Sequence, residues 1–557
     1  MMRGFRSIKI WGAFLVSGSL LSVAVAADGD CLQTILGRRA GWLAKAEASK
    51  PKLFYHDVEP VRMVRIVRDT AAFLGWKAED AGPCESAFGR GLKEGDALVF
   101  DFGEHLVGHL SFRLGETGRV MDAPCRLKFT FAELPGELTP LPQVWKGIPR
   151  SWFPDETMTF DFAPMDYALP RRYAFRYVKV EAVACRSGCP TLEGIKVTAE
   201  TSADASKIVP WTAPNAMAAK IDRVAHRTLR DCMQTMFEDG PKRDRRLWLG
   251  DLRLEALADY ETYRNFEIVK RSLYLLAGTA KDNGLVGTDA YEQPFPKPGD
   301  CRIYDYTALF PTVVLEYLEA SGDRETAEDL WPLCKRQAEL VLTCVDSAGL
   351  VQPTRNFVKP GDWWYFIDHD GKLDHQVPEQ GVVIFGLKGL LRLAEALGHA
   401  DEVADVSAKV AGMTAAAREM LWDAKRGIFT GEREKTPSCM GQAWMVIAGV
   451  PSAADARRCL KTILADATAL RPRTPYGYHY LIESLYVAGL RDRADGLLLS
   501  YWGGMIEKGA DTFWEAYVPG DDQSSPYDNT FLNSACHAWS CGPSYFLRSS
   551  KYRALAK

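Results

Sequence analysis

Residues 239–251 bring carboxylates, cationic groups and a tryptophan together in one short run. Their sequence is Asp-Gly-Pro-Lys-Arg-Asp-Arg-Arg-Leu-Trp-Leu-Gly-Asp, which mixes carboxylates, cationic groups, a tryptophan and two glycines. A pyranose pocket needs carboxylates for acid–base catalysis and hydroxyl recognition, arginine for paired hydrogen bonds and an aromatic face against the C–H side of the ring. The alternative is a structural salt-bridge network. The composition favours a functional site.

Three later clusters also combine charged and aromatic residues. They are 301–305, 360–365 with Asp368, His369 and Asp370, and 509–515 with Asp521, Asp522 and His537. Each has a structural alternative: Asp305 as a helix N-cap, Trp363 as a core aromatic, and His537 as a satisfied buried histidine. Glu515 follows a tryptophan in a loop rich in Gly and Asp, and it is the hardest of these residues to explain structurally.

Two kinds of periodicity indicate which elements position these clusters. Between about residues 50 and 200, apolar residues alternate with polar ones, as at Leu98, Phe100 and Phe102 and again over 158–162. Turn residues separate these runs, which is typical of an antiparallel β-sandwich. We assign residues 27–205 to this domain.

Beyond residue 205 the pattern becomes helical. Long amphipathic or wholly apolar segments cover 212–236, 325–345, 382–397 and 401–422. Segments that are apolar all round are expected to be inner helices, and striped ones to be outer helices. The predicted fold is therefore multidomain β + α, with the β-sandwich followed by an (α/α)6 toroid of six helical hairpins over residues 206–557. Loops at one end of such a toroid form the pocket.

The N-terminus predicts export. Arg3, Arg6 and Lys9 precede an apolar run that ends in Ala24-Val25-Ala26, a small-x-small cleavage pattern, so residues 1–26 are expected to be a signal peptide. We expect a periplasmic or secreted protein that does not insert into the membrane after cleavage. The formal net charge of −4 argues against nucleic acid or an anionic membrane as partner.

The 13 cysteines permit disulfides in an exported chain. Cys185 and Cys189 flank a short loop with glycine and are a candidate bridge, and Cys31 with Cys84 is a weaker one. No Cys/His spacing resembles a zinc site. No cofactor or catalytic metal is expected, and structural calcium remains open.

The chain resembles the bacterial α-L-rhamnosidases of glycoside hydrolase family 78. Residues 239–251 resemble the family signature Asp-Cys-Pro-Gln-Arg-Asp-Glu-Arg-Leu-Gly-Trp-Thr-Gly-Asp. Residues 98–103 and 175–178 resemble strands of the family's β-sandwich, and residues 361–363, 513–515 and 536–542 follow the signature in the family's order. The resemblance covers nearly the whole mature chain. It implies a six-hairpin catalytic barrel with an accessory β-sandwich, and inverting hydrolysis of terminal α-L-rhamnose.

The resemblance also implies residue roles. It places Asp239 and Arg243 at positions that hold rhamnose hydroxyls, Trp248 and Trp363 on aromatic walls, Asp251 at a further sugar-binding carboxylate and His537 at a pocket histidine. Glu515 matches the general base that activates water. We add Asp305 as a substrate-binding candidate from its cluster.

One position departs from the family pattern. The general acid of the signature is the Glu two residues after the Arg, and this chain has Arg245 there. Arginine cannot donate a proton at neutral pH. Asp244, Asp251 and Glu255 are the replacements; we favour Asp251, with Asp244 second.

The predicted mechanism needs two carboxyl groups roughly 6.5–9.5 Å apart with a water between them. Arg245 also leaves open a carbohydrate-binding protein on a degenerate scaffold, and α/α toroids also host polysaccharide lyases. The sequence identifies neither the aglycone nor the oligomeric state.

Overall fold

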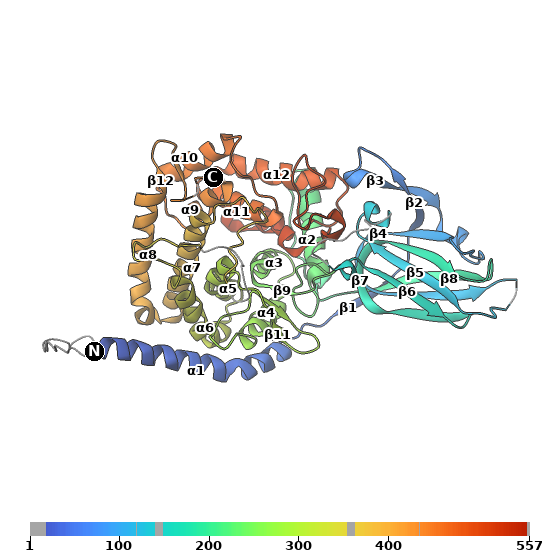
Figure 1. The fold of residues 1–557 in the computed structure, drawn as a ribbon, viewed down its shortest axis with the longest axis horizontal. Helices are drawn as coiled ribbons and strands as arrows, with labels where there is room; N and C mark the ends of the chain where they lie inside the picture. Colours follow the sequence, from blue (N-terminus) through green and yellow to red (C-terminus); the bar gives the residue numbers. More distant parts are fainter. Residues whose placement is uncertain (1–17, 119, 140–148, 354–361, 434, 554–557) are drawn as a thin grey trace, which may run out of the picture.

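The computed structural model describes residues 18–118, 120–139, 149–353, 362–433 and 435–553. A region of β-strands lies at one end of the molecule and a helical domain at the other, with helix α1 (Gly18–Ala48) running along the helical domain (Figure 1). The predicted combination of an antiparallel β region with a helical toroid is confirmed.

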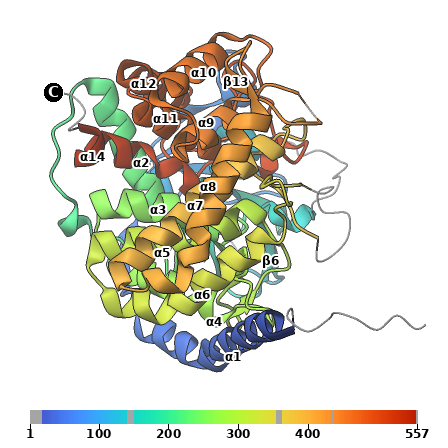
Figure 2. The ribbon, with the colours of Figure 1, turned by 90° about the vertical axis from the view of Figure 1, so that its left-hand side faces the viewer.

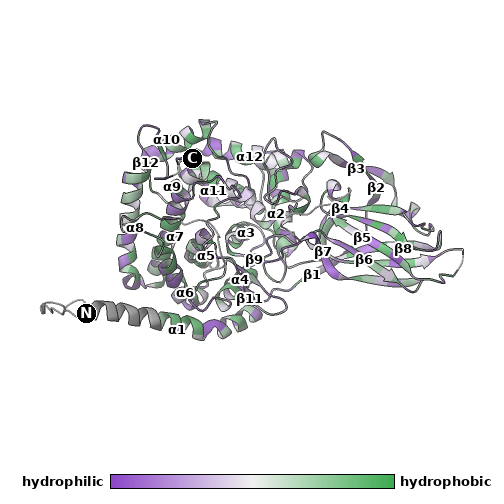
Figure 3. Ribbon diagram, in the orientation of Figure 1, coloured by the Kyte–Doolittle hydropathy of each residue, from purple (hydrophilic) through white to green (hydrophobic). Residues whose placement is uncertain are grey.

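The β region is one hydrogen-bonded antiparallel sheet. Its order is β1-β8-β4-β7-β5-β6, and β2 pairs with both β3 and β4. The strands are β1 (Phe54–Val58), β2 (Arg62–Arg68), β3 (Trp76–Gly82), β4 (Ala97–Glu116), β5 (Cys125–Ala132), β6 (Asp155–Phe160), β7 (Met165–Ala184) and β8 (Pro190–Thr201). Hydrophobic and hydrophilic residues alternate along these strands (Figure 3), and Phe100, Phe129 and Phe175 are fully buried between them. Phe162 departs from the predicted alternation, because β6 ends at Phe160 and Phe162 lies 70 % exposed in the turn that follows.

A bulge in β4 directs one side chain toward the helical domain. The register with β7 shifts between Asp101 and Leu106, and Gly103 in this segment has φ 83°. Such a bulge re-aims the side chains of the bulged strand. His105 thereby reaches α2 (Ala216–Cys232), where its Nδ1 lies 2.8 Å from Asp231.

The predicted start of the β domain at residue 27 is wrong. The first strand begins at Phe54, and the preceding helix α1 packs on α4 (Phe266–Gly278) and α6 (Arg324–Leu342) of the helical domain. Ile35 and Trp42 are buried in the core of that domain. The burial of these apolar side chains stabilises the packing of α1 on the helical domain. None of the described helices combines the length and hydrophobicity needed to cross a membrane.

The contacts between helices alternate between an inner and an outer ring, as predicted for the toroid. Helix α1 runs beneath α4 and α6 at the foot of this domain (Figure 2). Neighbouring inner helices contact one another, and the ring closes where α13 and the preceding 3-10 turn η9 (Ala538–Cys541) pack against α3. The inner helices are α3 (Leu249–Glu261), α5 (Tyr304–Ser321), α7 (Gln376–Leu397), α9 (Cys439–Ile447), α11 (Pro475–Val487) and α13 (Pro543–Arg548). The outer helices are α2, α4, α6, α8 (Ala404–Ala416), α10 (Ala453–Ala465) and α12 (Arg491–Glu507).

Local sequence signals set the hairpins. Gly322 ends α5 with φ 73°, and Asp323 then caps α6 by accepting a hydrogen bond from the Thr326 N–H at 3.1 Å. Glycine also lets inner helices approach closely: a Cβ on Gly386 of α7 would lie 2.0 Å from the carbonyl oxygen of Ala308 in α5. The turn at Gly322 and Asp323 therefore joins inner helix α5 to outer helix α6.

Candidate active site

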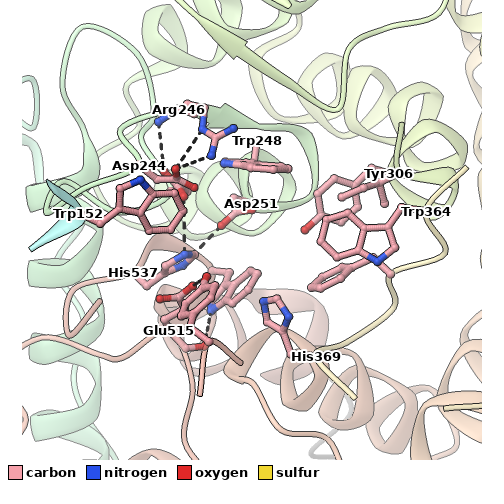
Figure 4. A pocket seen from close by; sticks show the side chains of 15 residues that line it. Trp152, Asp244, Arg246, Trp248, Asp251, Tyr306, Trp364, His369, Glu515 and His537 are labelled. Atoms are coloured by element: carbon pink, nitrogen blue, oxygen red, sulfur yellow. Dashed lines mark hydrogen bonds and ion pairs between the residues drawn. The ribbon is translucent and has the colours of Figure 1, made fainter. Parts of the chain in front are cut away.

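A pocket of about 610 Å3, including its open mouth, lies where the barrel loops meet the β region (Figure 4). Aromatic side chains surround a group of carboxylates and histidines. The lining residues are Trp152, Asp239, Asp244, Arg246, Trp248, Asp251, Ile303, Tyr306, Trp364, Phe366, His369, Glu515, Tyr527, His537 and Trp539. The predicted Asp239, Asp244, Trp248, Asp251, Glu515 and His537 therefore all converge on one pocket.

The backbone of the 239–251 segment closes on itself at Asp239. The Asp239 N–H donates to the Arg246 carbonyl at 3.0 Å, and its Oδ1 accepts from the Arg246 N–H at 3.1 Å. Arg246 then reaches over the Trp248 ring, with its guanidinium 4.8 Å from the ring centroid, and donates to Asp244 at 3.1 Å. This loop presents Asp244 and Trp248 to the pocket.

Arg245 points away from the pocket. Its φ of 53° is in the left-handed region, and it donates from Nε to the Pro241 carbonyl at 2.8 Å and from Nη2 to the Arg172 carbonyl of β7. Burial and the nearby Arg172 lower the pKa of Arg245 to about 10, so it remains a cation at neutral pH. The family's acid position therefore contributes to the contact between the two regions of this chain and supplies no proton donor.

Glu515 is held as a carboxylate. Arg243 Nη2 donates to both of its oxygens at 2.9 Å, the Ser534 N–H donates at 2.9 Å, and the Tyr527 hydroxyl donates to Oε1. Burial raises the pKa of Glu515, but Arg243, His537 and these hydrogen bonds outweigh it and lower the pKa to about 2. Glu515 is therefore a carboxylate at neutral pH. Arg243 is not among the residues that line the pocket and instead holds Glu515; its predicted contact with rhamnose hydroxyls stays a prediction.

Asp239, Asp251 and His537 form a buried acidic floor. His537 lies between the two carboxylates, with Nε2 3.9 Å from Asp239 and Nδ1 3.6 Å from Asp251. Burial, then Glu515 and Asp244, raise the pKa of Asp251 well above its ordinary value; burial, with Asp244 and Asp251, does the same for Asp239. Burial lowers the pKa of His537 to about 4, so the ring is neutral at pH 7.

Several polar atoms of this site make no hydrogen bond with any described residue, although two of them, Asp251 Oδ1 and His537 Nδ1, lie 3.6 Å from each other. They are Asp251 Oδ1, His537 Nδ1 and the indole Nε1 of Trp248. Leaving a buried polar atom unpaired costs about 1–3 kcal/mol. All three residues line the pocket, so a ligand with several hydroxyl groups satisfies them. A sugar ring has this chemistry.

Two predicted binding residues lie outside the pocket. Asp305 accepts hydrogen bonds from the N–H groups of Phe366 and Ile367 at 3.1 and 3.3 Å, which fixes the following loop onto α5. Trp363 packs edge-on against Tyr304, at 5.4 Å between ring centroids, while its neighbour Trp364 lines the pocket. Neither Asp305 nor Trp363 is among the residues that line the pocket, and their sugar-binding roles stay predictions.

The sequence analysis missed other members of the pocket. Trp364, Phe366 and His369 lie in or beside the cluster 360–370 identified from the sequence, and their closeness to its charged residues could have pointed to them. Tyr527 and Trp152 had none: Tyr527 is in a long loop, and Trp152 comes from the β region.

A buried network joins the β region to the catalytic loops. Lys242 Nζ, fully buried, contacts Glu137 at 2.7 Å and the carbonyl of Asn533 at 3.0 Å. Among the described residues, His105, Asp231 and Cys536 form the group able to hold a metal ion, with ligand atoms within 4.8 Å of one another. His105 is already hydrogen-bonded to Asp231 at 2.8 Å. These contacts make the site a product of both regions.

No disulfide joins the cysteines of the described residues. The predicted bridges Cys185–Cys189 and Cys31–Cys84 are absent. Cys185 donates instead to the Leu92 carbonyl at 3.6 Å, and Cys84 to that of Pro60 at 3.5 Å.

Comparisons with known proteins agree with this architecture. The glycosyl hydrolase family 78 alpha-rhamnosidase N-terminal domain matches residues 60–189, and the bacterial alpha-L-rhamnosidase six-hairpin glycosidase domain matches residues 211–550. None of the curated proteins matches this chain.

Solved structures give the same result. A rhamnosidase from Klebsiella oxytoca with rhamnose bound is 38 % identical, with a TM-score of 0.87 over 91 % of this chain and 98 % of that one. A family 78 rhamnosidase of Bacillus sp. GL1 is 22 % identical (TM-score 0.71, 85 % of this chain and 49 % of that one) and shares the fold. A Streptomyces avermitilis α-L-rhamnosidase complexed with L-rhamnose is 17 % identical (TM-score 0.63, 89 % and 44 %) and also shares it. The chain belongs to the α-rhamnosidases of glycoside hydrolase family 78 and is a glycoside hydrolase.

Proposed function

We propose that this glycosidase releases terminal α-L-rhamnose from glycosides or oligosaccharides with inversion at the anomeric carbon. The observation that carries the proposal is the contrast between two buried carboxyl groups facing one pocket. The pKa of Glu515 is lowered to about 2, while that of Asp251 is raised well above its ordinary value. A glycosidase needs one ionised and one protonated carboxyl group at the same pH.

In this mechanism Glu515 accepts a proton from water as the water attacks the anomeric carbon. A proton passes from the carboxylic acid to the glycosidic oxygen, the C–O bond breaks, and rhamnose leaves with the new hydroxyl on the opposite face. Three donors, Arg243 Nη2, the Tyr527 hydroxyl and the Ser534 N–H, already make four hydrogen bonds to Glu515. The water therefore has to share or replace one of them, and the Tyr527 hydroxyl, which lines the pocket, is the one in position to yield.

Asp251 is our first choice for the acid and Asp244 the second. Asp251 holds its proton because it is buried beside other carboxylates. Asp244 is ion-paired with Arg246 and lies 3.7 Å from Arg243, and its side chain is more exposed than that of Asp251, 13 % against 3 %. The raised pKa of Asp251 therefore favours Asp251 as the proton donor, whereas the greater exposure of Asp244 toward the pocket mouth favours Asp244.

Asp239, His537 and Trp248 bind the sugar in this proposal. Asp239 and His537 offer a carboxyl group and a neutral imidazole to its hydroxyls, and Trp248 offers a ring face and an indole N–H. In this proposal Asp239, His537 and Trp248 hold the sugar, while Glu515 and the carboxylic acid carry out the proton transfers.

The test is to incubate the protein with an aryl α-L-rhamnoside and a rhamnosyl disaccharide and to quantify free rhamnose. Release of rhamnose from both supports the proposal. Calorimetric binding of rhamnose without turnover, or release of a different sugar from a panel of deoxysugar glycosides, would overturn it.

We also propose export through cleavage after Ala26. Cleavage there retains Ile35 and Trp42, which anchor α1 on the barrel. N-terminal sequencing of the protein from a periplasmic or culture fraction tests this: a mature chain starting near Ala27 supports export, and an intact Met1 in the cytoplasmic fraction contradicts it.

A further inference from the structure

Trp152 is the member of the pocket that the β region supplies, among the lining residues that the structure describes. It ends the 3-10 turn η4 (Arg150–Trp152), which precedes β6. All the other lining residues come from the helical domain, from Asp239 onward. The β region therefore contributes an indole ring directly to the site.

The polar side chains of the pocket become more exposed from its floor toward its mouth. The side chains of Asp251 and His537 on the floor are 3 % and 4 % exposed, whereas Asp244 is 13 % exposed. A terminal rhamnose that satisfies the unpaired floor atoms occupies the bottom of the pocket. Its leaving group must then extend toward the mouth, on the side of Asp244 and Trp152, which both line the pocket and each contact Arg243 (Figure 4).

One face of the Trp152 ring is already occupied. The Arg243 guanidinium lies 4.5 Å from the ring centroid, and Tyr527 meets the indole nearly perpendicularly at 6.2 Å. Because Arg243 is itself fixed by Glu515 and by the Leu532 carbonyl at 2.8 Å, it supports the ring rigidly. The half-buried indole lines the pocket with the surface that these contacts leave uncovered.

We propose that Trp152 is the platform of a leaving-group subsite, so that the preferred substrates carry a second ring next to the rhamnose. This inference rests on the proposed rhamnosidase activity and adds its substrate class. An indole face stacks on the C–H side of a pyranose or on an aromatic aglycone, and both ligands share this flat apolar surface. The β region thereby acts in specificity as well as in folding.

The test compares Trp152→Ala and Trp152→Phe with the wild type on three substrates. α-L-Rhamnosyl fluoride has no ring in its leaving group, an aryl rhamnoside has an aromatic ring, and a rhamnosyl-glucose disaccharide has a pyranose. Trp211→Ala is the matched control, because Trp211 also lies against a guanidinium, that of Arg548 at 5.5 Å, but outside this pocket.

Trp152→Ala is expected to lower kcat/KM about tenfold on at least one ring-bearing substrate, which corresponds to about 1.4 kcal/mol. Rhamnosyl fluoride turnover and the inhibition constant of free L-rhamnose stay within about twofold of wild type. Trp152→Phe retains most of the activity, and Trp211→Ala matches wild type. The two ring-bearing substrates are then compared. If kcat/KM falls more for the aryl rhamnoside, the preferred leaving group is aromatic; if it falls more for the disaccharide, the preferred leaving group is a sugar.

Three results would overturn the inference. An equal loss on rhamnosyl fluoride means that Trp152 only supports Arg243 and Glu515. A weaker inhibition by L-rhamnose places Trp152 in the rhamnose subsite, and unchanged kinetics on all substrates removes the subsite altogether. Failure of the wild type to cleave any of the three substrates is a different outcome, since it refutes the rhamnosidase activity itself.

Discussion

Replacement of Arg243 by methionine is expected to move the ionisation of Glu515 into the measurable pH range. In the wild type, Arg243 and the other partners lower the pKa of Glu515 from 4.5 to about 2, against the opposing effect of burial. At about 1.4 kcal/mol for each pKa unit, this difference is worth on the order of 3 kcal/mol. Loss of one partner of a buried ion pair typically costs about 3–5 kcal/mol, which is the same scale.

The direction of the pH effect follows from the sign of the shift. Because the folded pKa of Glu515 lies below the unfolded one, the stabilisation is present above pH 4.5 and is lost as the pH falls from there toward about 2. Wild-type kcat/KM should therefore show no acid limb from Glu515 above about pH 4. Without Arg243, burial dominates and the pKa rises above 4.5, so an acid limb appears in the methionine variant.

The assay is kcat/KM for an aryl rhamnoside between pH 4 and pH 9, with circular dichroism at each pH to confirm folding. Arg243→Lys is the control: it keeps a cation beside Glu515 and should keep the acid limb below pH 4.5. A wild-type acid limb near pH 6, or a methionine variant whose profile does not move, refutes the electrostatic account of Glu515.

Other substitutions test the remaining assignments. Glu515→Gln should lower kcat at least 1,000-fold while calorimetry still detects rhamnose binding; normal turnover would refute the base assignment. Asp251→Asn and Asp244→Asn distinguish the acid, because loss of the acid slows a disaccharide far more than an aryl rhamnoside with a good leaving group; if neither shows this pattern, both candidates are wrong. Arg245→Ala should lower the free energy of unfolding by about 1–3 kcal/mol, as expected for lost buried hydrogen bonds, with kcat within about threefold of wild type; a large loss of kcat would return Arg245 to the catalytic machinery. Burial raises the pKa of Asp305 to about 7, so the wild type loses stability as the pH rises from about 4 through 7; urea unfolding of Asp305→Asn should show a flatter pH dependence, and an unchanged slope contradicts this.

The alternating and helical periodicities predicted the fold well, because they record which faces of strands and helices are buried. The alternation at Phe100 and Phe102 corresponds to buried positions of β4, and the predicted helical segment 325–345 corresponds to α6. Helix α1 was misplaced because its buried residues, such as Trp42, do not reveal in the sequence which domain they pack against.

The site was predictable where catalytic side chains cluster in the sequence, as in residues 239–251 and 509–515. Side-chain direction was not predictable. The left-handed φ of Arg245 turns its guanidinium toward β7, and a one-residue difference in the loop exchanges Trp363 for Trp364. Trp152 could not be predicted as a pocket residue, because it reaches the pocket only through the packing of the β region against the helical domain.

The account depends most on Glu515 acting on a water from the face of the sugar opposite the leaving group. Proton NMR of the first seconds of rhamnoside hydrolysis tests this directly, because it resolves the two anomers of free rhamnose before they equilibrate. Inversion predicts that β-L-rhamnose forms first and that the α anomer grows in later at the rate of spontaneous mutarotation. Initial formation of α-L-rhamnose would show a covalent intermediate on the enzyme and would contradict the role assigned to Glu515.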